Sequence, residues 1–166
     1  MRISNGGKTL RRGPSSPELA SCFGASVISR GKATWTIKID SGQTVENVMI
    51  GVAQPTLKLD DCTHSSRLKP ALPGKAWWIK NKGNTTYDLP ENVHKFGKGD
   101  TVRVDVDLDD GTIEFRINET LKENGLRDKH VRGPVALWVN LDYDATISIT
   151  SVLVGTVSRD TVAGSE

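Results

Sequence analysis

The strongest constraint on the fold is a two-residue repeat of apolar side chains between residues 101 and 117. Apolar residues occupy every second position on both sides of a turn: Val102, Val104, Val106 and Leu108 before it, and Ile113, Phe115 and Ile117 after it. Successive side chains of a strand point to opposite faces, so the repeat predicts two strands, each with one buried face. Asp110-Gly111 between them is a sequence signal of a tight hairpin.

The same period recurs nearer the N-terminus. Residues 34–40 alternate polar and apolar, which predicts a half-buried strand with Trp35, Ile37 and Ile39 facing inward. Residues 48–53 are almost wholly apolar and β-branched, and they are interrupted by a glycine where a side chain would crowd an approaching backbone.

Two further apolar runs lie near the C-terminus, at residues 135–141 and 146–154. We expect them to form a strand pair joined across Asp142-Tyr143-Asp144. Short strands separated by Gly and Pro, with almost no sign of an amphipathic helix, predict an all-β fold, an antiparallel sandwich or barrel.

Length and composition favour one globular domain. The chain has 166 residues, of which 36% are hydrophobic and 25% charged, and a net charge of +2. This balance gives no electrostatic footprint for capturing nucleic acid or anionic lipid. No stretch approaches the roughly 20 apolar residues that span a bilayer. Residues 1–12 also lack the apolar core of a secretory signal, so we expect an intracellular protein, cytoplasmic or nuclear.

Composition shifts divide the chain into three parts. Residues 1–20 are rich in Gly, Ser, Pro and Arg and are predicted to be a flexible arm, part of which lines the binding surface. Residues 21–155 form the predicted domain, and the small polar residues 156–166 a disordered tail. The connection over residues 54–76 is long, and loops of that length are usually functional or disordered.

Several of these segments resemble the SPRY domain family. Trp35 with Ile37 and Ile39 resembles the family's opening "yWEv" strand, and Ile50-Gly51-Val52-Ala53 its "VGVA" strand. Residues 76–78 fall where the family places a tryptophan before a polar stretch. Residues 99–118 are similar to its "GD-vGv-lDl-GtlsF-lNg" hairpin, and residues 133–137 to the "plyPavs" strand. The resemblance covers about residues 22–150 in the family's order; Glu119 departs from it, because the family usually has glycine there.

The resemblance implies a bent antiparallel β-sandwich of the concanavalin-like jelly-roll type, with loops that form a shallow binding surface. SPRY domains are generally not enzymes, and they serve as recognition parts of ubiquitin ligase adaptors, chromatin complexes, channels and immune sensors. The function expected from the resemblance is therefore a non-catalytic protein-protein interaction module that binds a peptide or protein partner.

The resemblance also implies which residues bind. In SPRY proteins that carry a SOCS box, the binding loops use an Arg-x-Pro near the start, a tyrosine after the tryptophan strand, and a late loop. The corresponding residues here are Arg12, Pro14, Tyr87, Asp142, Tyr143 and Asp144. We expect the arginine to pair with a carboxylate or carbonyl and the tyrosines to bury apolar ligand surface. The loop over residues 54–76 would shape one wall. The late loop lacks the family's Val-Trp-Gly, so the same ligand is not expected.

Trp77 completes the predicted partner-binding set. Neighbouring residues on a strand point to opposite faces, so only one of Trp77 and Trp78 can face inward. By family position we expect Trp78 to be buried and Trp77 to be partly exposed.

Catalytic and metal chemistry find little support. Asp105, Asp107, Asp109 and Asp110 do not have the spacing of a calcium loop, and no nucleophile elbow, phosphate loop or CxxC pair occurs. Asp105 or Asp107 together with Glu114 imitates the paired acids of sandwich glycosidases, but outward acids on a hairpin are ordinary. We therefore predict no catalytic residues, no metal and no cofactor.

The alternative function is glycan or nucleic-acid binding by the same fold. Basic residues that could gather beside Trp77 and Tyr87 to bind single strands are Lys80, Lys82, Lys95, Lys98 and Arg103. A solvated basic rim explains them equally well, so a protein partner is favoured; no membrane partner is expected, and the oligomeric state is open.

Overall fold

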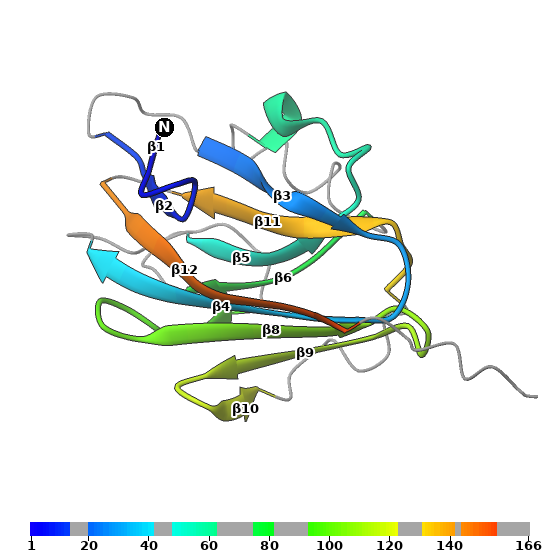
Figure 1. Cartoon of the computed structure of the whole chain (residues 1–166). Helices are drawn as coiled ribbons and strands as arrows, with labels where there is room; N and C mark the ends of the chain where they lie inside the picture. The colour runs from blue at the N-terminus through cyan, green and yellow to red at the C-terminus, as the bar shows by residue number, and fades with distance from the viewer. Residues whose placement is uncertain are drawn as a thin grey trace, which may run out of the picture.

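A computed structural model shows two β-sheets packed face to face (Figure 1). It describes residues 1–13, 20–41, 48–62, 75–81, 93–122, 131–141 and 144–155. The predicted all-β sandwich is confirmed, and within the described residues the only helix is one 3-10 turn, η1 (Leu59–Cys62). No described helix has the length and apolarity to cross a membrane.

The larger sheet has seven strands, and each of its pairings is antiparallel. In spatial order they are β1 (Arg2–Ser4), β2 (Thr9–Arg11), β12 (Thr146–Gly155), β4 (Lys32–Ser41), β8 (Thr101–Asp107), β9 (Thr112–Ile117) and β10 (Thr120–Lys122). The smaller sheet has five, in the order β3 (Ala20–Ile28), β11 (Val135–Leu141), β5 (Met49–Ala53), β6 (Ala76–Asn81) and β7 (Val93–His94). Only the last pair, β6 with β7, is parallel among the described strands.

The hairpin predicted from residues 101–117 is confirmed as β8 and β9. Val104 lies opposite Phe115 and Val106 lies opposite Ile113, and all four side chains are buried. The alternating polar residues face outward, because the sheet has its apolar contact on one side only.

The next turn, between β9 and β10, forms although Glu119 replaces the usual glycine. Asn118 and Glu119 both adopt left-handed backbone conformations, with φ of 49° and 64°. Two consecutive residues with positive φ between paired strands are the geometry of a type I′ turn, which favours Asn-Gly. The family's glycine would fit this position without strain.

The expected pairing of residues 135–141 with 146–154 is wrong. β11 lies inside the five-stranded sheet between β3 and β5, whereas β12 pairs with β2 and β4 in the other sheet. Every residue of β11 is buried, which requires a strand covered on both faces. β12 alternates at its start and so fits a sheet with one covered face.

The N-terminal arm also differs from the expectation. Residues 2–11 form an antiparallel hairpin of β1 and β2 rather than a flexible segment, and β2 extends the larger sheet by pairing with β12. Leu10 is buried opposite Ile147, which attaches the hairpin to the core. Residues 14–19 and the predicted disordered tail, 156–166, lie outside the described residues.

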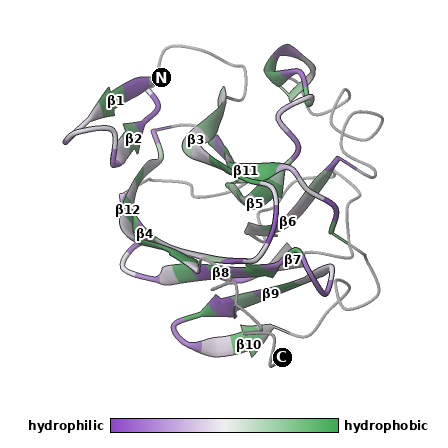
Figure 2. Cartoon of the chain, turned by 45° about the vertical axis from the view of Figure 1, so that its right-hand side comes forward, coloured by the Kyte–Doolittle hydropathy of each residue, from purple (hydrophilic) through white to green (hydrophobic). Residues whose placement is uncertain are grey.

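Apolar side chains form two clusters. The main core lies between the sheets and includes Trp35, Ile37 and Phe115. The second cluster covers the outer face of the five-stranded sheet and comprises Met49, Ala53, Leu57, Cys62, Ala76, Trp78 and Trp138. Figure 2 accordingly shows hydrophobic residues along β5 and β11. The central strands β5 and β11 of the five-stranded sheet are therefore buried on both faces.

Gly51 stands between the two tryptophans of the second cluster. It pairs with Trp78 on one side and Trp138 on the other, and their rings meet edge to face with centroids 6.4 Å apart. A Cβ at this position would lie 2.0 Å from the carbonyl oxygen of Trp77. The predicted crowding at Gly51 is confirmed.

Candidate partner-binding surface

The connection from β11 to β12 crosses from one sheet to the other, and the residues after β2 hold both of its ends. The Arg12 amide donates to the carbonyl of Ala145 at 3.0 Å, and the Arg12 Nη1 donates to the carbonyl of Leu141 at 3.4 Å. The Arg12 residue is only 2% exposed. A buried guanidinium is retained where its donors find acceptors, so Arg12 ties the start of the connection to its end.

An exposed ion pair adds a second link. Arg11 Nη2 lies 3.3 Å from Asp144 Oδ1, with 59% and 39% of the two side chains exposed. Asp144 has a φ of 52°, a left-handed conformation that aspartate tolerates better than most residues. Arg11 is not among the predicted site residues, although it directly precedes Arg12 in the sequence.

Among the predicted site residues, the structure brings Arg12 and Asp144 to this connection. Arg12 differs from the expectation in one respect: its side chain is buried under the connection and binds a carbonyl of the chain itself. It therefore supports the surface instead of forming part of it. Pro14, Tyr87, Asp142 and Tyr143 lie outside the described residues.

The expected partial exposure of Trp77 is wrong. Trp77 and Trp78 do point to opposite faces of β6, but they are only 5% and 8% exposed. Trp77 packs in the main core and Trp78 in the second cluster. The prediction assigned the two faces of β6 the wrong way round. Trp77 faces the core between the sheets, and Trp78, on the outer face, is covered by residues of the long connection, including Leu57 and Cys62.

The described part of that connection, residues 54–62, is thus mainly a cover for the sheet. Leu57 is 3% exposed and Cys62 is fully buried. Asn140 Nδ2 on β11 donates to the Cys62 carbonyl at 3.0 Å, which fixes η1 to the strand beneath it. This segment forms a wall of the second cluster.

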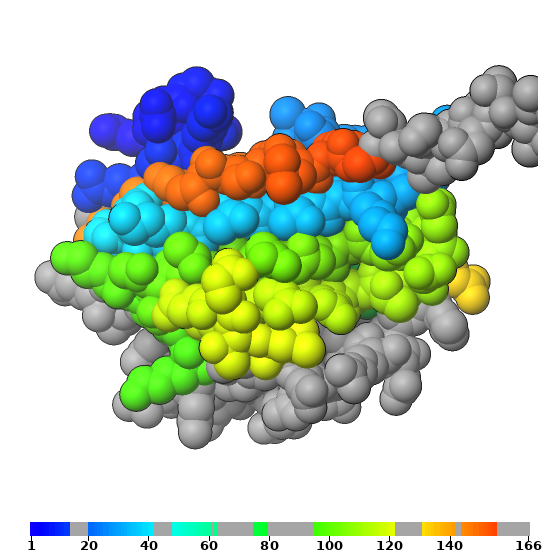
Figure 3. All heavy atoms as spheres, turned by 60° about the horizontal axis from the view of Figure 1, so that its bottom comes forward, coloured from blue at the N-terminus to red at the C-terminus, as the bar shows by residue number. Residues whose placement is uncertain are grey.

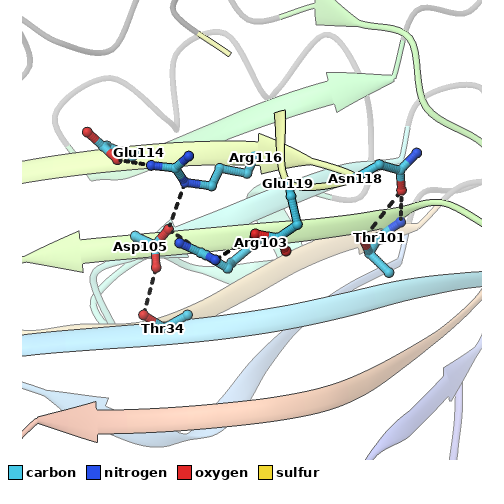
Figure 4. Close-up of polar contacts among 8 residues, drawn as sticks. All are labelled: Thr34, Thr101, Arg103, Asp105, Glu114, Arg116, Asn118 and Glu119. Carbon is cyan, nitrogen blue, oxygen red and sulfur yellow. Dashed lines mark hydrogen bonds and ion pairs between the residues drawn. The ribbon is translucent and has the colours of Figure 1, made fainter. Parts of the chain in front are cut away.

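The outer face of the seven-stranded sheet carries an ordered charge network (Figure 4). Asp105 accepts hydrogen bonds from the Thr34 hydroxyl at 2.7 Å and from Arg103 Nε at 2.8 Å. Arg103 also contacts Glu119 at 2.8 Å, and Arg116 contacts Glu114 at 3.2 Å.

The register explains this pattern. Arg103 lies directly opposite Arg116, and Asp105 lies opposite Glu114. Like charges therefore face each other across the strands, while opposite charges alternate along each strand and neutralise them. The hydrogen bond to Asp105 is the main cause that raises the pKa of Arg103.

This network bears on the alternative functions. Asp105 and Glu114, the acids that imitate a glycosidase pair, are both engaged by arginines. Arg103, the strand residue of the predicted nucleic-acid site, is held by two carboxylates. The side chains of Lys80 and Lys82 lie outside the described part. Within the described ranges, no three His, Cys, Asp or Glu residues gather as metal ligands.

Comparison with protein families decides the assignment. A family model of the SPRY domain matches residues 32–150. The chain belongs to the SPRY domain family. Members of this family are generally protein-interaction modules and generally non-catalytic, and no curated protein sequence matches the chain.

Solved SPRY structures share the fold. The SPRY domain of human HERC1 is 19% identical, with a TM-score of 0.61 over 89% of this chain and 90% of that one. The TRIM65 PSpry domain is 14% identical, with a TM-score of 0.66 over 90% and 85%. A structure described as a human SPRY domain is 13% identical, with a TM-score of 0.61 over 89% and 93%. At these identities the likeness concerns the fold alone.

Proposed function

We propose that this SPRY domain binds a peptide or protein segment at the surface made by the β11–β12 connection and the residues that follow β2. The observation that supports the proposal is the double anchoring of that connection by Arg11 and Arg12. Fixing both ends before binding lowers the entropy lost on association, which favours recognition there.

The chemistry of the surface indicates what it recognises. Arg11 and Asp144 present one positive and one negative side chain, both substantially exposed. Pro14, Tyr87, Asp142 and Tyr143 stay in the proposal as ligand contacts, because tyrosine supplies a large contact area with little rotamer entropy to lose. Arg12 is assigned the supporting role described above, and Trp77 is dropped from the set.

We also keep the expectation of an intracellular, non-catalytic adaptor as part of this proposal. Cys22 and Cys62 are both free thiols, in keeping with a reducing compartment. A membrane partner is not proposed, and nucleic-acid binding is disfavoured by the pairing of Arg103.

Affinity capture from cell lysate, followed by mass spectrometry, tests the proposal. Tyr87→Ala combined with Tyr143→Ala should remove the proteins captured by the wild type while leaving its melting temperature nearly unchanged. Lys38→Ala, an exposed residue on the outer face of β4, is the matched control and should capture the same proteins. Equal capture by the double variant and the control would show that these tyrosines do not recognise the partner.

A second variant tests the anchoring itself. Asp144→Asn removes the charge that pairs with Arg11 and keeps a side chain that tolerates the left-handed backbone of residue 144, and it should weaken capture at least about ten-fold. Because an exposed ion pair contributes little to stability, the melting temperature should change little. Unchanged capture would place the binding surface elsewhere.

A further inference from the structure

One edge of the seven-stranded sheet is only partly paired. β2 pairs with Thr146, Ile147 and Ser148 of β12, and the Ile149 amide donates to the Lys8 carbonyl at 2.8 Å. Beyond that point no described residue pairs with β12 on this side, although β4 pairs with it as far as Gly155 on the other. Figure 3 shows β12 along the rim of the sheet, with the N-terminal hairpin beside one end of it.

Three consecutive residues within the stretch 150–155, which no described residue pairs with on this side, are apolar and exposed. Val152, Leu153 and Val154 are 45%, 64% and 48% exposed, and they are three of the six large hydrophobic residues exposed among the described ones. Directly opposed residues of paired strands share a face. Val152 lies opposite the buried Trp35, so it points toward the core layer and yet remains half uncovered.

Other edges of this sheet are protected in the usual ways. Natural edge strands are often short or carry charged side chains, because unpaired backbone amides and carbonyls can hydrogen-bond to a strand of another chain. β1 and β10 have three residues each and carry Arg2 and Lys122. Residues 150–155 read Thr-Ser-Val-Leu-Val-Gly and contain no charge.

We propose that residues 150–155 of β12 accept an extended segment of another protein, which adds to the sheet as a strand in line with β2. Backbone hydrogen bonds to the free edge would supply affinity, and alternate side chains would supply specificity. One set would cover Val152 and Val154, and the other would lie beside Leu153. This site is separate from the proposed loop surface.

Charge identifies the chemistry of the incoming segment. Lys8 lies at the start of the free edge, and Arg30 and Lys32 lie near its end, where Lys32 is the partner of Gly155. Lys32 contacts Asp107 at 3.0 Å, whereas no carboxylate of the described residues pairs with Lys8 or Arg30. The segment that fits is apolar at alternate positions and carries an acidic residue at each end.

The same charges oppose a second copy of this chain as the occupant. Two β12 edges joined by a two-fold axis run antiparallel, so residue 150 of one copy would face residue 155 of the other. That arrangement brings Lys8 of one copy toward Arg30 of the other, next to the residue that pairs with Gly155. Like charges at both ends disfavour self-association.

A synthetic peptide tests the proposal directly. The probe is a fluorescently labelled, acetylated and amidated peptide, Asp-Val-Thr-Val-Thr-Val-Asp, measured by anisotropy against the full chain. Leu153→Lys should weaken binding at least about ten-fold, because it places a charge on the edge. Val27→Lys, on the edge strand β3 of the other sheet and 55% exposed, is the matched control and should leave binding unchanged.

Two further arms separate strand addition from non-specific adhesion. N-methylation of alternate amides of the probe removes backbone donors and should abolish binding although the side chains are unchanged. Lys8→Glu with Arg30→Glu should reverse the preference, so that a probe ending in lysines binds better than one ending in aspartates. Tyr87→Ala with Tyr143→Ala should leave probe binding intact, which distinguishes this edge from the loop surface.

Three results would overturn the proposal. Equal binding by Leu153→Lys and Val27→Lys, or no loss on N-methylation, would exclude strand addition at this edge. Failure of the probe to bind at millimolar concentration would do the same. Sedimentation velocity that shows a dimer lost in Leu153→Lys would identify a second copy as the occupant instead.

Discussion

The five-stranded and seven-stranded sheets differ in how many of their faces are buried. Every residue of β5 and β11 is buried, whereas β8 and β9 alternate between buried and more exposed residues. A strand covered on both faces reads as a continuous apolar run, and one covered on a single face reads as an alternation. The spacing of apolar residues along a strand therefore indicates whether one or both of its faces are buried. It also indicates which sheet has a solvent-exposed face.

The second buried face needs a cover, and the connection after β5 supplies it. Leu57 and Cys62 pack on Trp78 and Trp138, so the described part of the segment expected to shape a binding wall contributes to the domain's packing. On the seven-stranded sheet the corresponding face carries paired charges. The two surfaces that we propose for recognition are the connection held by Arg11 and Arg12 and the edge of β12 that no described residue pairs with.

Among substitutions that add a single methyl group, we expect the largest loss of stability in the five-stranded sheet. In Gly51→Ala the added Cβ would meet the Trp77 carbonyl oxygen at 2.0 Å, and backbone cannot move away as a side-chain end can. We expect a loss of at least about 3 kcal/mol, at the upper end for overpacked interiors, or no folded protein. Chemical denaturation with intrinsic tryptophan fluorescence measures it.

Gly155→Ala, at the end of β12 in the other sheet, is the control. Its Cβ would meet Lys32 at no less than 3.6 Å, an ordinary contact, so the free energy of unfolding should change by less than about 0.5 kcal/mol. Similar losses for the two variants would show that the sheets are equally tolerant and would contradict the comparison.

Removal of the cover should have the next largest effect. Leu57→Ala deletes a buried side chain from the second cluster and should cost about 2–3 kcal/mol. Lys38→Ala, on the solvent face of β4, should change stability by less than about 0.5 kcal/mol. Urea titrations of the two variants measure the difference. If Leu57→Ala behaved like the control, the connection would not be a structural cover.

The sequence predicted the one-sided strands well and the two-sided ones incompletely. Alternation placed Trp35 and Phe115 in the core, and the structure confirms both. The same logic could not decide which tryptophan of β6 faces the core, because both faces of that strand are covered. It could not separate β11 from β12 either, because that depends on which strands pair. Strand pairing and the covering of a face are long-range contacts, and the local spacing of apolar residues does not determine them.

The candidate site was harder to predict for a related reason. Family position brought Arg12 and residue 144 to one place, as the structure does, but it did not reveal that the arginine is buried. The free edge of β12 gave no sequence signal, since its exposure arises from the short reach of β2.

A smaller effect is expected on the charged side of the larger sheet. Lys32 donates a hydrogen bond to Asp107, and this contact is the main cause that lowers the pKa of the Asp107 carboxyl below its usual value. A lowered pKa in the folded state gives stability that is present above the ordinary pKa of aspartate, near 4. It is lost as the pH falls through the lower folded value.

Asp107→Asn tests this dependence. At pH 7 the variant should melt slightly below the wild type, by a fraction of the shift caused by Leu57→Ala, because the Lys32 side chain of the pair is 76% exposed. The difference in melting temperature should close as the pH falls from about 4 through the lowered folded pKa of Asp107. Below that pH the wild-type carboxyl is neutral, and the variant has no carboxyl at this position. Thermal melts across this range measure it, and a gap that widened toward acid pH would contradict the assigned sign.

We expect the smallest change in stability for substitutions in the turn between β9 and β10, where two variants distinguish backbone strain from ion pairing. Glu119 has a φ of 64°, which costs a non-glycine residue about 1 kcal/mol, and its side chain contacts Arg103 while 67% exposed. Glu119→Gln removes the charge and keeps the strain, whereas Glu119→Gly removes both. Because an exposed pair stabilises by roughly 0–1 kcal/mol, we expect Glu119→Gly to be more stable than Glu119→Gln by about 1 kcal/mol and close to the wild type. Equilibrium denaturation of the three proteins gives the two differences. A glycine variant less stable than the glutamine one would mean that side-chain contacts, and not the backbone, hold glutamate in this turn.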